Sequence, residues 1–226
     1  MKDIYKKMYD SEKGLDLLDN PRIKSMVQII DNLDLKDKKI LDIGCYDGTF
    51  LSLIKNRNNN FFGIEASDFG FKKSSEREIN VKQFFFNDKD HIPFQDNSFN
   101  IVVAGEIIEH IYDTDFFLKE IYRILKSNGL LLISTPNIAS LGRRIFLLLG
   151  KNPIIEISPN DKDSSGHIRY FTFKTISDLL EKNNLCKVKV QSDIVNFSIN
   201  GKIQSEILAK LIPSFGQSVI GLFRKK

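Results

Sequence analysis

The sequence predicts an α/β fold in which one mostly parallel sheet carries helices on both faces. Short apolar runs, which have the character of buried strands, alternate with segments whose apolar residues recur at helical spacing. The first run, residues 39–43, passes directly into a turn with two glycines, as in folds that bind a nucleotide at the end of a strand. A length of 226 residues, 42% of them apolar, suits a single core. We therefore expect one domain over residues 1–226.

The expected elements follow one another along the chain. A helix opened by Pro21 should pack on the sheet through Ile23, Met26, Ile29, Ile30 and Leu33. Strands are expected at residues 39–43, 61–65, 81–86, 99–104, 130–134, 186–190 and 218–223. Later helices are expected after Asp113 (ending at Gly129) and at residues 141–149, 171–180 and 203–211. Residues 138–170 and 199–216 are expected to be insertions around this framework.

Charge, cysteine content and hydropathy argue against several classes of protein. The net charge of +4 is spread along the chain, so no stripe for nucleic acid stands out. Cys45 and Cys186 form neither a metal-binding spacing nor a disulfide framework. The N-terminus lacks the apolar core of a signal peptide, and the longest apolar cluster, residues 145–149, is far shorter than the roughly 20 residues that span a bilayer. We expect a cytoplasmic protein, monomeric or homodimeric, without a transmembrane segment.

The turn after residues 39–43 carries the strongest functional signal. Gly44 and Gly48 allow backbone conformations that a Cβ would obstruct, and they leave space for a ligand against the turn. The dinucleotide fingerprint would also need glycines at positions 46 and 49, where the chain has Tyr46 and Thr49. Asp42, at the end of the strand, suits an ammonium group better than a pyrophosphate. These residues therefore favour a cofactor that contains an amino acid.

The run from residue 39 to residue 50 resembles the first motif of the class I S-adenosylmethionine (SAM) dependent methyltransferases, acid-x-Gly-x-Gly-x-Gly, with Tyr46 in place of the middle glycine. The resemblance extends over residues 39–180. It implies a Rossmann-like sheet whose last strand is antiparallel, pairs with the sixth and forms the edge. Tyr46 either keeps an ordinary backbone angle with its ring turned away or covers the methionine end of the cofactor.

The same resemblance implies which residues bind SAM. Glu65, about 20 residues after the glycine turn, would accept the ribose hydroxyls. Asp88 would bind the adenine amino group, with the backbone of Lys89 beside the ring, whereas His91 is expected to be a surface residue without a role. The full set of expected cofactor-binding residues is Asp42, Gly44, Cys45, Tyr46, Gly48, Glu65, Ala66, Asp88, Lys89, Gly105 and Glu106.

Two histidines are candidates for catalysis. Methyl transfer is an in-line displacement, so the enzyme must mainly align donor and acceptor and exclude water. A hydroxyl acceptor must also lose a proton, and an imidazole exchanges protons near neutral pH. His110 and His167 are the candidates, and His167 lies in a His-x-Arg-x-Phe-Thr run that resembles small-molecule methyltransferases of bacterial type.

A metal site is the alternative use of the same region. If the turn containing Glu106, Glu109 and His110 is helical, the three side chains share one face and suit magnesium, manganese or zinc. This Glu-x-x-Glu-His run resembles ubiquinone-pathway and small-RNA 2′-O-methyltransferases that use a metal. A similar Glu-His pair also occurs in metal-free members, and we favour a site without metal.

The resemblance as a whole implies transfer of a methyl group to a small-molecule acceptor. We expect a hydroxyl on a sugar or related metabolite, because residues 134–137 and 167–172 resemble enzymes of surface-polysaccharide synthesis. In such enzymes an N-terminal segment, here residues 1–36, acts as a lid, and an insertion such as 138–170 lines the acceptor pocket. For the short apolar helix in this insertion three other roles stay open: a lid, a dimer contact or a membrane-surface face. Two alternatives remain: a metal-assisted O-methyltransferase acting on RNA or a ubiquinone-type precursor, and a non-catalytic SAM-binding regulatory or scaffold protein.

Overall fold

The computed structural model describes residues 18–33, 35–55, 59–87, 90–153, 166–197 and 203–226. A seven-stranded sheet runs through these residues in the order β3-β2-β1-β4-β5-β9-β6. Its strands are β1 (Lys39–Ile43), β2 (Asn60–Glu65), β3 (Asn80–Gln83), β4 (Phe99–Gly105), β5 (Leu125–Pro136), β6 (Leu185–Gln191) and β9 (Ser218–Lys225). β9 runs antiparallel to the other six strands, which are parallel to one another. The predicted mostly parallel sheet with an antiparallel last strand is confirmed.

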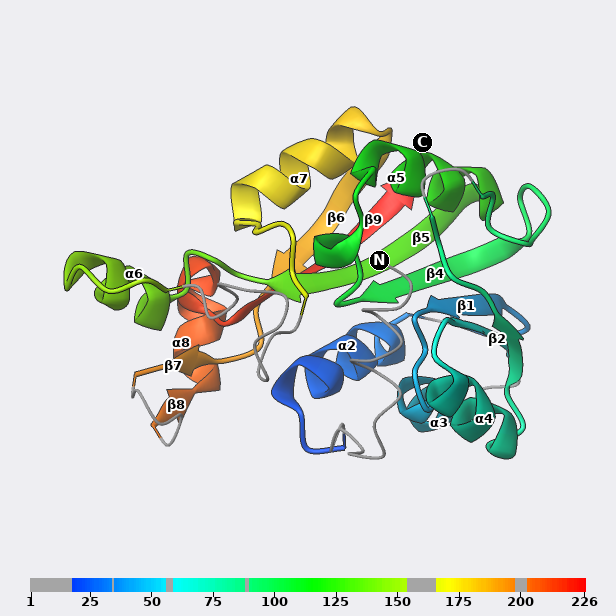
Figure 1. Ribbon diagram of the computed structural model, residues 1–226, viewed down its shortest axis with the longest axis horizontal. Coiled ribbons are helices and arrows are strands. Elements are labelled where there is room, and N and C mark those ends of the chain that lie inside the picture. The colour runs from blue at the N-terminus through cyan, green and yellow to red at the C-terminus, as the bar shows by residue number, and fades with distance from the viewer. Residues whose placement is uncertain (1–17, 34, 56–58, 88–89, 154–165, 198–202) are drawn as a thin grey trace.

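Helices cover both faces of the sheet, as expected (Figure 1). α5 (Thr114–Ile124) and α7 (Phe173–Lys182) lie on one face, and α2 (Pro21–Asp31) and α3 (Thr49–Ile54) lie on the other. Alternate residues of each strand point to opposite faces. Leu131 of β5 therefore packs in the cluster that holds Phe117 of α5, while Leu132 joins the cluster that holds Met26 of α2.

The first described helix forms as its sequence predicts. The Asn20 side chain accepts hydrogen bonds from the backbone N–H groups of Arg22 and Ile23, and Pro21 occupies the first turn, where its missing N–H costs no hydrogen bond. The helix buries the side chains Ile23, Met26, Ile29 and Ile30 against the sheet. This packing brings Arg22 to the edge of the sheet where β4 and β5 end.

Three strand predictions were wrong in detail. The fifth strand begins at Leu125 because α5 ends at Ile124, so Gly129 lies within the strand and does not end the helix. Asn128 takes a left-handed backbone angle, φ 62°, and the pairing with β4 shifts register between Phe99 and Ile101, so this strand bulges where it starts. β3 ends at residue 83, not 86.

The third error concerns the sheet edge. β9 pairs with β6 as expected but lies between β5 and β6, and all but one of its residues are buried. The edge strand on this side of the sheet is β6, which exposes Lys187 and Lys189. Lysines on an edge strand oppose pairing with another chain. An apolar strand such as β9 gains more from two neighbours than from one.

The remaining elements gather beyond the carboxyl ends of β4 and β5 (Figure 1). They are α6 (Leu141–Leu148), α8 (Glu206–Leu211), the short pair β7 (Val195–Asn196) and β8 (Gln204–Ser205), and the 3₁₀ helices η1 (Ile108–His110) and η2 (Pro213–Phe215). α4 (Asp68–Glu76) follows β2. None of the described helices is long and apolar enough to cross a membrane. The roles expected of residues 1–36, 138–170 and 199–216 stay predictions.

Candidate cofactor and acceptor site

The turn between β1 and α3 needs its glycines for two different reasons. Gly44 and Gly48 both take left-handed angles, φ 73° and 77°. A Cβ at Gly44 would collide with the side chain of Ile107, which lies in the loop after β4. A Cβ at Gly48 would collide with Ile79, between α4 and β3. Gly44 therefore lets the two loops of the crevice approach each other, and Gly48 lets α4 pack on the turn.

Tyr46 departs from one of the two expected arrangements. Its φ of 45° is left-handed, so it does not keep an ordinary backbone angle. Its ring lies 5.9 Å from the ring of Phe69 on α4. Its backbone N–H donates to Oε2 of Glu65 at 2.8 Å. The tyrosine thus adopts the conformation that a glycine would take here, and its side chain lies beside α4.

Cys45 contributes little side-chain surface to the crevice. Its thiol is buried against Gly63 of β2, and burial raises its pKa well above the usual range. The backbone N–H groups of Gly44 and Cys45 both donate to the carbonyl of Ile64. Any contact that Cys45 makes with a cofactor would therefore come from its main chain, and its expected role stays a prediction.

Glu65 ends β2 as a buried carboxylate. Oε2 accepts the N–H of Tyr46, and Oε1 accepts the N–H of Ser67 at 2.7 Å, with the half-buried Ala66 between them. Each carboxylate oxygen can accept a second hydrogen bond. The backbone thus orients the side chain expected to hold the ribose hydroxyls. Asp88 and Lys89, expected at the adenine, lie outside the described residues.

Asp42 is the acid at the end of β1. Only 5% of it is exposed. Burial and the negative charge of Glu65 raise its pKa to about 8, although the positive charge of Arg22 acts in the opposite direction. In the absence of a cationic ligand the carboxyl is therefore mostly neutral at neutral pH. A bound ammonium would stabilise its charged form.

Arg22 is the site residue that the sequence prediction missed. Its Nη1 donates to Oγ of Ser134 at 3.3 Å, and its Nε lies 3.7 Å from Oε1 of Glu106. Ser134 also donates to that Glu106 oxygen at 3.2 Å. Arg22 directly follows the Asn20-Pro21 helix start, a signal that places a basic side chain in the first turn of the helix but does not tell which way it points. Arg22 thus brings a guanidinium into a crevice that is lined by acidic side chains.

The charge pattern of this crevice fits SAM. Asp42, Glu65 and Glu106 supply carboxylates at the ends of β1, β2 and β4, and Glu106 takes a left-handed φ of 56° directly after Gly105. Burial raises the pKa of Glu106, so a nearby cation would be favourable. SAM carries an ammonium, a sulfonium and one carboxylate. The acids suit its two cations, and Arg22 suits its carboxylate.

A second polar cluster lies on the acceptor side. Glu109 is 1% exposed, and its Oε2 accepts a hydrogen bond from Oγ1 of Thr135 at 3.1 Å. Oε1 is buried and accepts no hydrogen bond from the described residues, while Nε2 of His167 lies 3.8 Å away. The rings of His110 and His167 meet edge to face at 4.9 Å. The structure thus brings the two predicted catalytic histidines together.

Backbone contacts hold His167 in place. The N–H groups of Ile168 and Arg169 both donate to the carbonyl of Glu109, and Nε of Arg169 donates to the carbonyl of Ile111. Nδ1 of His110 lies 3.2 Å from the carbonyl of Gly166. His110 therefore helps to hold the segment that carries His167.

The two glutamates of the Glu-x-x-Glu-His run bond side chains that point to opposite faces of the sheet. Glu106 bonds Ser134 and Glu109 bonds Thr135, and consecutive residues of a strand point to opposite sides. Glu106 therefore pairs with Arg22 and does not join His110. Among the described residues, the side chains close enough to share a metal ion are Glu109, His110 and His167, whose ligand atoms lie within 4.8 Å of one another.

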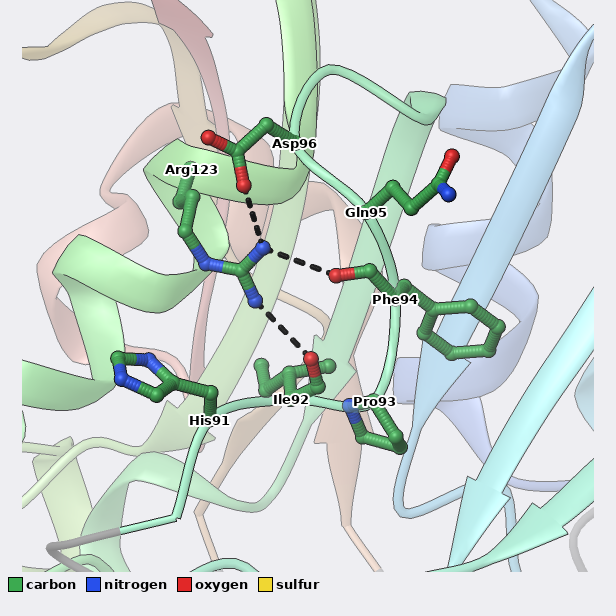
Figure 2. Close-up of a pocket in the computed structure, with 7 residues that line it drawn as sticks. All are labelled: His91, Ile92, Pro93, Phe94, Gln95, Asp96 and Arg123. Atoms are coloured by element: carbon green, nitrogen blue, oxygen red, sulfur yellow. Dashed lines mark hydrogen bonds and ion pairs between the residues drawn. The ribbon is translucent and has the colours of Figure 1, made fainter.

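The open hollow of about 530 Å³ beside α5 has a different character (Figure 2). Arg123 donates to the carbonyls of Ile92 and Phe94 and to Asp96, and it also bonds both carboxylate oxygens of Glu120. His91, expected at the surface, has a 71% exposed side chain and bonds Glu120. The hydrogen bonds of Arg123 thus tie residues 92–96 to α5.

The fold and crevice agree with a known family. The family model described as a methyltransferase domain matches residues 21–190, well over half of the chain. The chain is a class I SAM-dependent methyltransferase. SAM is its cofactor. The prediction of an enzyme is confirmed, and the alternative of a non-catalytic SAM-binding protein is not carried further.

Relatives and solved structures agree with this assignment. A ubiquinone biosynthesis O-methyltransferase from Pelagibacter ubique is 29% identical over 170 residues, which are 73% of this methyltransferase and 68% of the relative. The chain spans only 44% and 42% of the lengths of two other curated relatives. A SAM-dependent methyltransferase from Thermotoga maritima superposes over the whole of both chains with a TM-score of 0.71 at 21% identity.

A further solved structure carries the product cofactor. The 1,6-didemethyltoxoflavin-N1-methyltransferase from Burkholderia thailandensis, with its substrate and S-adenosylhomocysteine bound, has a TM-score of 0.65 at 11% identity, covering 100% of this methyltransferase and 87% of that chain. At such identities these likenesses show the fold. They leave the acceptor of this methyltransferase to be argued from its own residues.

Proposed function

We propose that this methyltransferase methylates a hydroxyl group of a small-molecule acceptor and that His167 removes the hydroxyl proton. The observation that carries the proposal is the buried Oε1 of Glu109, which has no hydrogen-bond donor among the described residues and faces Nε2 of His167. A carboxylate beside one ring nitrogen orients an imidazole and stabilises its protonated form. The imidazole of His167 would then take up the hydroxyl proton.

The chemistry needs few protein groups. SAM supplies a methyl group on a positively charged sulfur that is already a good leaving group. The acceptor oxygen would form a bond to the methyl carbon, the electrons of the carbon–sulfur bond would stay on sulfur, and the hydroxyl proton would pass to His167. His110 would act as a positioning residue through its contact with Gly166. Alignment and exclusion of water would supply most of the acceleration.

Two considerations support a hydroxyl acceptor and, within that class, a sugar or related polar metabolite. The Pelagibacter relative is named as an O-methyltransferase, which agrees with oxygen as the acceptor atom. Asp193 and Arg143 are close enough to Glu106 to influence its pKa, so charged groups surround this side of the crevice. Such groups suit an acceptor with several hydroxyls better than a plain aromatic ring.

A metal-assisted reaction is the second candidate. Glu109, His110 and His167 would hold the ion, since one carboxylate and two imidazoles suit zinc or manganese and water can complete the shell. An ion there would supply Lewis acidity toward the acceptor oxygen. This candidate keeps a ubiquinone-type precursor as an alternative acceptor. We favour the metal-free reaction, because the His167–Glu109 contact accounts for proton removal without an ion.

A panel of acceptors tests both candidates. Purified methyltransferase is incubated with SAM carrying a labelled methyl group and with nucleotide sugars, catechols or amines, each with and without EDTA. We expect labelled methyl ether on a sugar, in equal amount with EDTA. Labelling of a catechol that EDTA abolishes would favour the metal-assisted candidate, provided that elemental analysis finds the ion on the wild type and not on His167→Ala. Labelling of amines alone would overturn the proposal.

The expected cytoplasmic location stays a prediction.

A further inference from the structure

The apolar surface beyond the carboxyl ends of the strands is not used by the chemistry above. Of the fourteen large apolar side chains that are exposed in the described part of the chain, nine belong to this region: Ile145, Leu147, Leu148, Leu149, Phe197, Ile203, Ile207, Leu211 and Ile212. Leu148 is 86% exposed and Leu211 is 74% exposed. No residue of α6 is buried. We call these nine side chains the α6–α8 face. A concentration of this kind marks an interaction surface.

The parts of the α6–α8 face are joined by specific contacts. The guanidinium of Arg144 on α6 lies 5.1 Å from the ring centroid of Phe215, in η2 after α8, and it also bonds the carbonyl of Ser214. Asn137, before α6, donates to the same carbonyl at 3.0 Å. Phe197 donates its backbone N–H to Ile203 at 2.9 Å across the β7–β8 pair. Figure 1 shows these elements together at one end of the molecule.

The charges beside these apolar side chains indicate what covers them. Arg144, Lys151 and Lys210 are exposed on or next to α6 and α8, against one exposed acid, Glu206, in the described part of these two segments. Exposed leucines and isoleucines flanked by lysine and arginine are typical of helices that lie in the headgroup region of a bilayer. Such cations are attracted to anionic lipids. The excess of cations over acids around the apolar side chains therefore favours an anionic lipid surface as the occupant.

We propose that the α6–α8 face docks on the surface of an anionic lipid bilayer. The apolar side chains enter the boundary between headgroups and acyl chains, and the cations contact lipid phosphates. α6 has eight residues and α8 has six, so both lie along the surface and neither crosses it.

The position of α6 gives this docking a consequence for the acceptor. Arg143 of α6 donates to the carbonyl of Asn137 at 3.0 Å, and its charge influences the pKa of Glu106. One helix thus reaches from the crevice to the exposed face. Where the proposed hydroxyl acceptor holds, a docked enzyme would take an amphiphile whose hydroxyl-bearing head enters the crevice while its tail stays in the bilayer. Docking itself does not depend on that acceptor.

Vesicle co-sedimentation of the full chain tests the proposal without any acceptor. We expect the wild type to sediment with phosphatidylcholine vesicles that contain phosphatidylglycerol and to stay in the supernatant with phosphatidylcholine alone. Leu147→Glu/Leu148→Glu should lower the bound-to-free ratio by at least about tenfold. Lys151→Gln/Lys210→Gln should weaken binding to the anionic vesicles by a smaller factor. Val188→Glu, at an exposed apolar position on the edge strand β6, is the matched control and should bind as the wild type does.

Several results would overturn the proposal. Failure of the wild type to bind anionic vesicles would do so, as would equal binding to neutral vesicles or an equal loss in the Val188→Glu control. Sedimentation velocity without lipid tests whether a second copy of the chain covers the face instead. A dimer that dissociates in Leu147→Glu/Leu148→Glu would assign the face to that second copy. Calorimetry with SAM checks that each variant is folded. If the double variant does not fold, Ile207→Glu on α8 tests the same face independently.

Discussion

Two buried glutamates of this methyltransferase differ in how their hydrogen bonds are satisfied. Both oxygens of Glu120 accept from the guanidinium of Arg123, at 2.8 and 2.7 Å, and one also accepts the N–H of Ile92. Glu109 receives only Oγ1 of Thr135 on one oxygen, and its other oxygen is buried without a donor from the described residues. A satisfied acid holds the fold together. An acid with an open oxygen is available for a ligand or a reaction.

The pKa values of these two acids reflect the same difference. Burial alone would raise the pKa of Glu120, but hydrogen bonds from Arg123, His91 and Ile92 outweigh it and hold that pKa at about 2. Burial dominates at Glu109, together with the negative charge of Glu106, and raises its pKa well above the usual range. A cation or a proton beside Glu109 would therefore relieve an unfavourable burial. Substitutions at these two acids and at their neighbours test this difference.

The largest effect is expected from the loss of His167. His167→Ala should lower kcat by about 100- to 10,000-fold, because it removes the proposed proton acceptor, while calorimetry should find SAM binding unchanged. Glu109→Gln should lower kcat in the same assay, since an amide cannot stabilise a protonated imidazole. His110→Asn, which can still donate to the carbonyl of Gly166, is the control and should retain more activity than His110→Ala. A kcat of His167→Ala within tenfold of the wild type, about 1.4 kcal/mol, would refute the assignment.

Breaking the satisfied cluster should affect stability and leave function intact. Arg123→Ala leaves Glu120 buried without its partner and should lower the free energy of unfolding by about 3 kcal/mol in urea titrations. Because the pKa of Glu120 is lowered from 4.5 to about 2, its contribution is present above pH 4.5 and is lost as the pH falls toward 2. Lys174→Ala removes an exposed pair with Asp178 and should cost much less stability than Arg123→Ala, because solvent screens that pair. SAM affinity should not change in either folded variant.

A smaller effect is expected at the cofactor end of the crevice. Arg22→Ala should weaken binding of S-adenosylhomocysteine about tenfold, because the guanidinium is proposed to meet its carboxylate. The same variant should bind 5′-methylthioadenosine, which lacks the amino-acid portion, as tightly as the wild type does. The affinity of Arg22→Lys for S-adenosylhomocysteine should lie between that of the wild type and that of Arg22→Ala. Equal losses for both ligands would mean that Arg22 acts only through the packing of α2.

The smallest effect expected on ligand binding is the release of one proton. The pKa of Asp42 is about 8 in the free protein, and the ammonium of SAM would favour the carboxylate. Binding at pH 7 should therefore release about one proton, measured by calorimetry in buffers of different ionisation enthalpy. Asp42→Asn should release none. In the unfolded chain Asp42 loses its proton near pH 4, whereas in the folded protein it keeps the proton up to about pH 8. Its contribution to the free energy of unfolding should therefore fall as the pH rises between these two values. Stability of Asp42→Asn should lack this slope.

Local sequence patterns were enough to predict the sheet and much of the crevice. Apolar runs ended by turns predicted the strands, and Asp42 and Glu65 follow from the rule that parallel strands end at one edge of a sheet. Gly44 and Gly48 take left-handed angles, as their turn requires. The bulge at Asn128 was not predicted, because a register shift depends on the neighbouring strand.

The α/β class, the family and the acids at the strand ends could be read from the sequence, because each depends on residues that are neighbours in the chain. Tertiary structure alone decided that Arg22 enters the crevice, that His167 reaches Glu109 and that Glu106 and Glu109 bond side chains that point to opposite faces. It also decided that the leucines of α6 are exposed. The physical reason is that a helical or strand period tells which residues share a face. What that face meets depends on how distant segments pack.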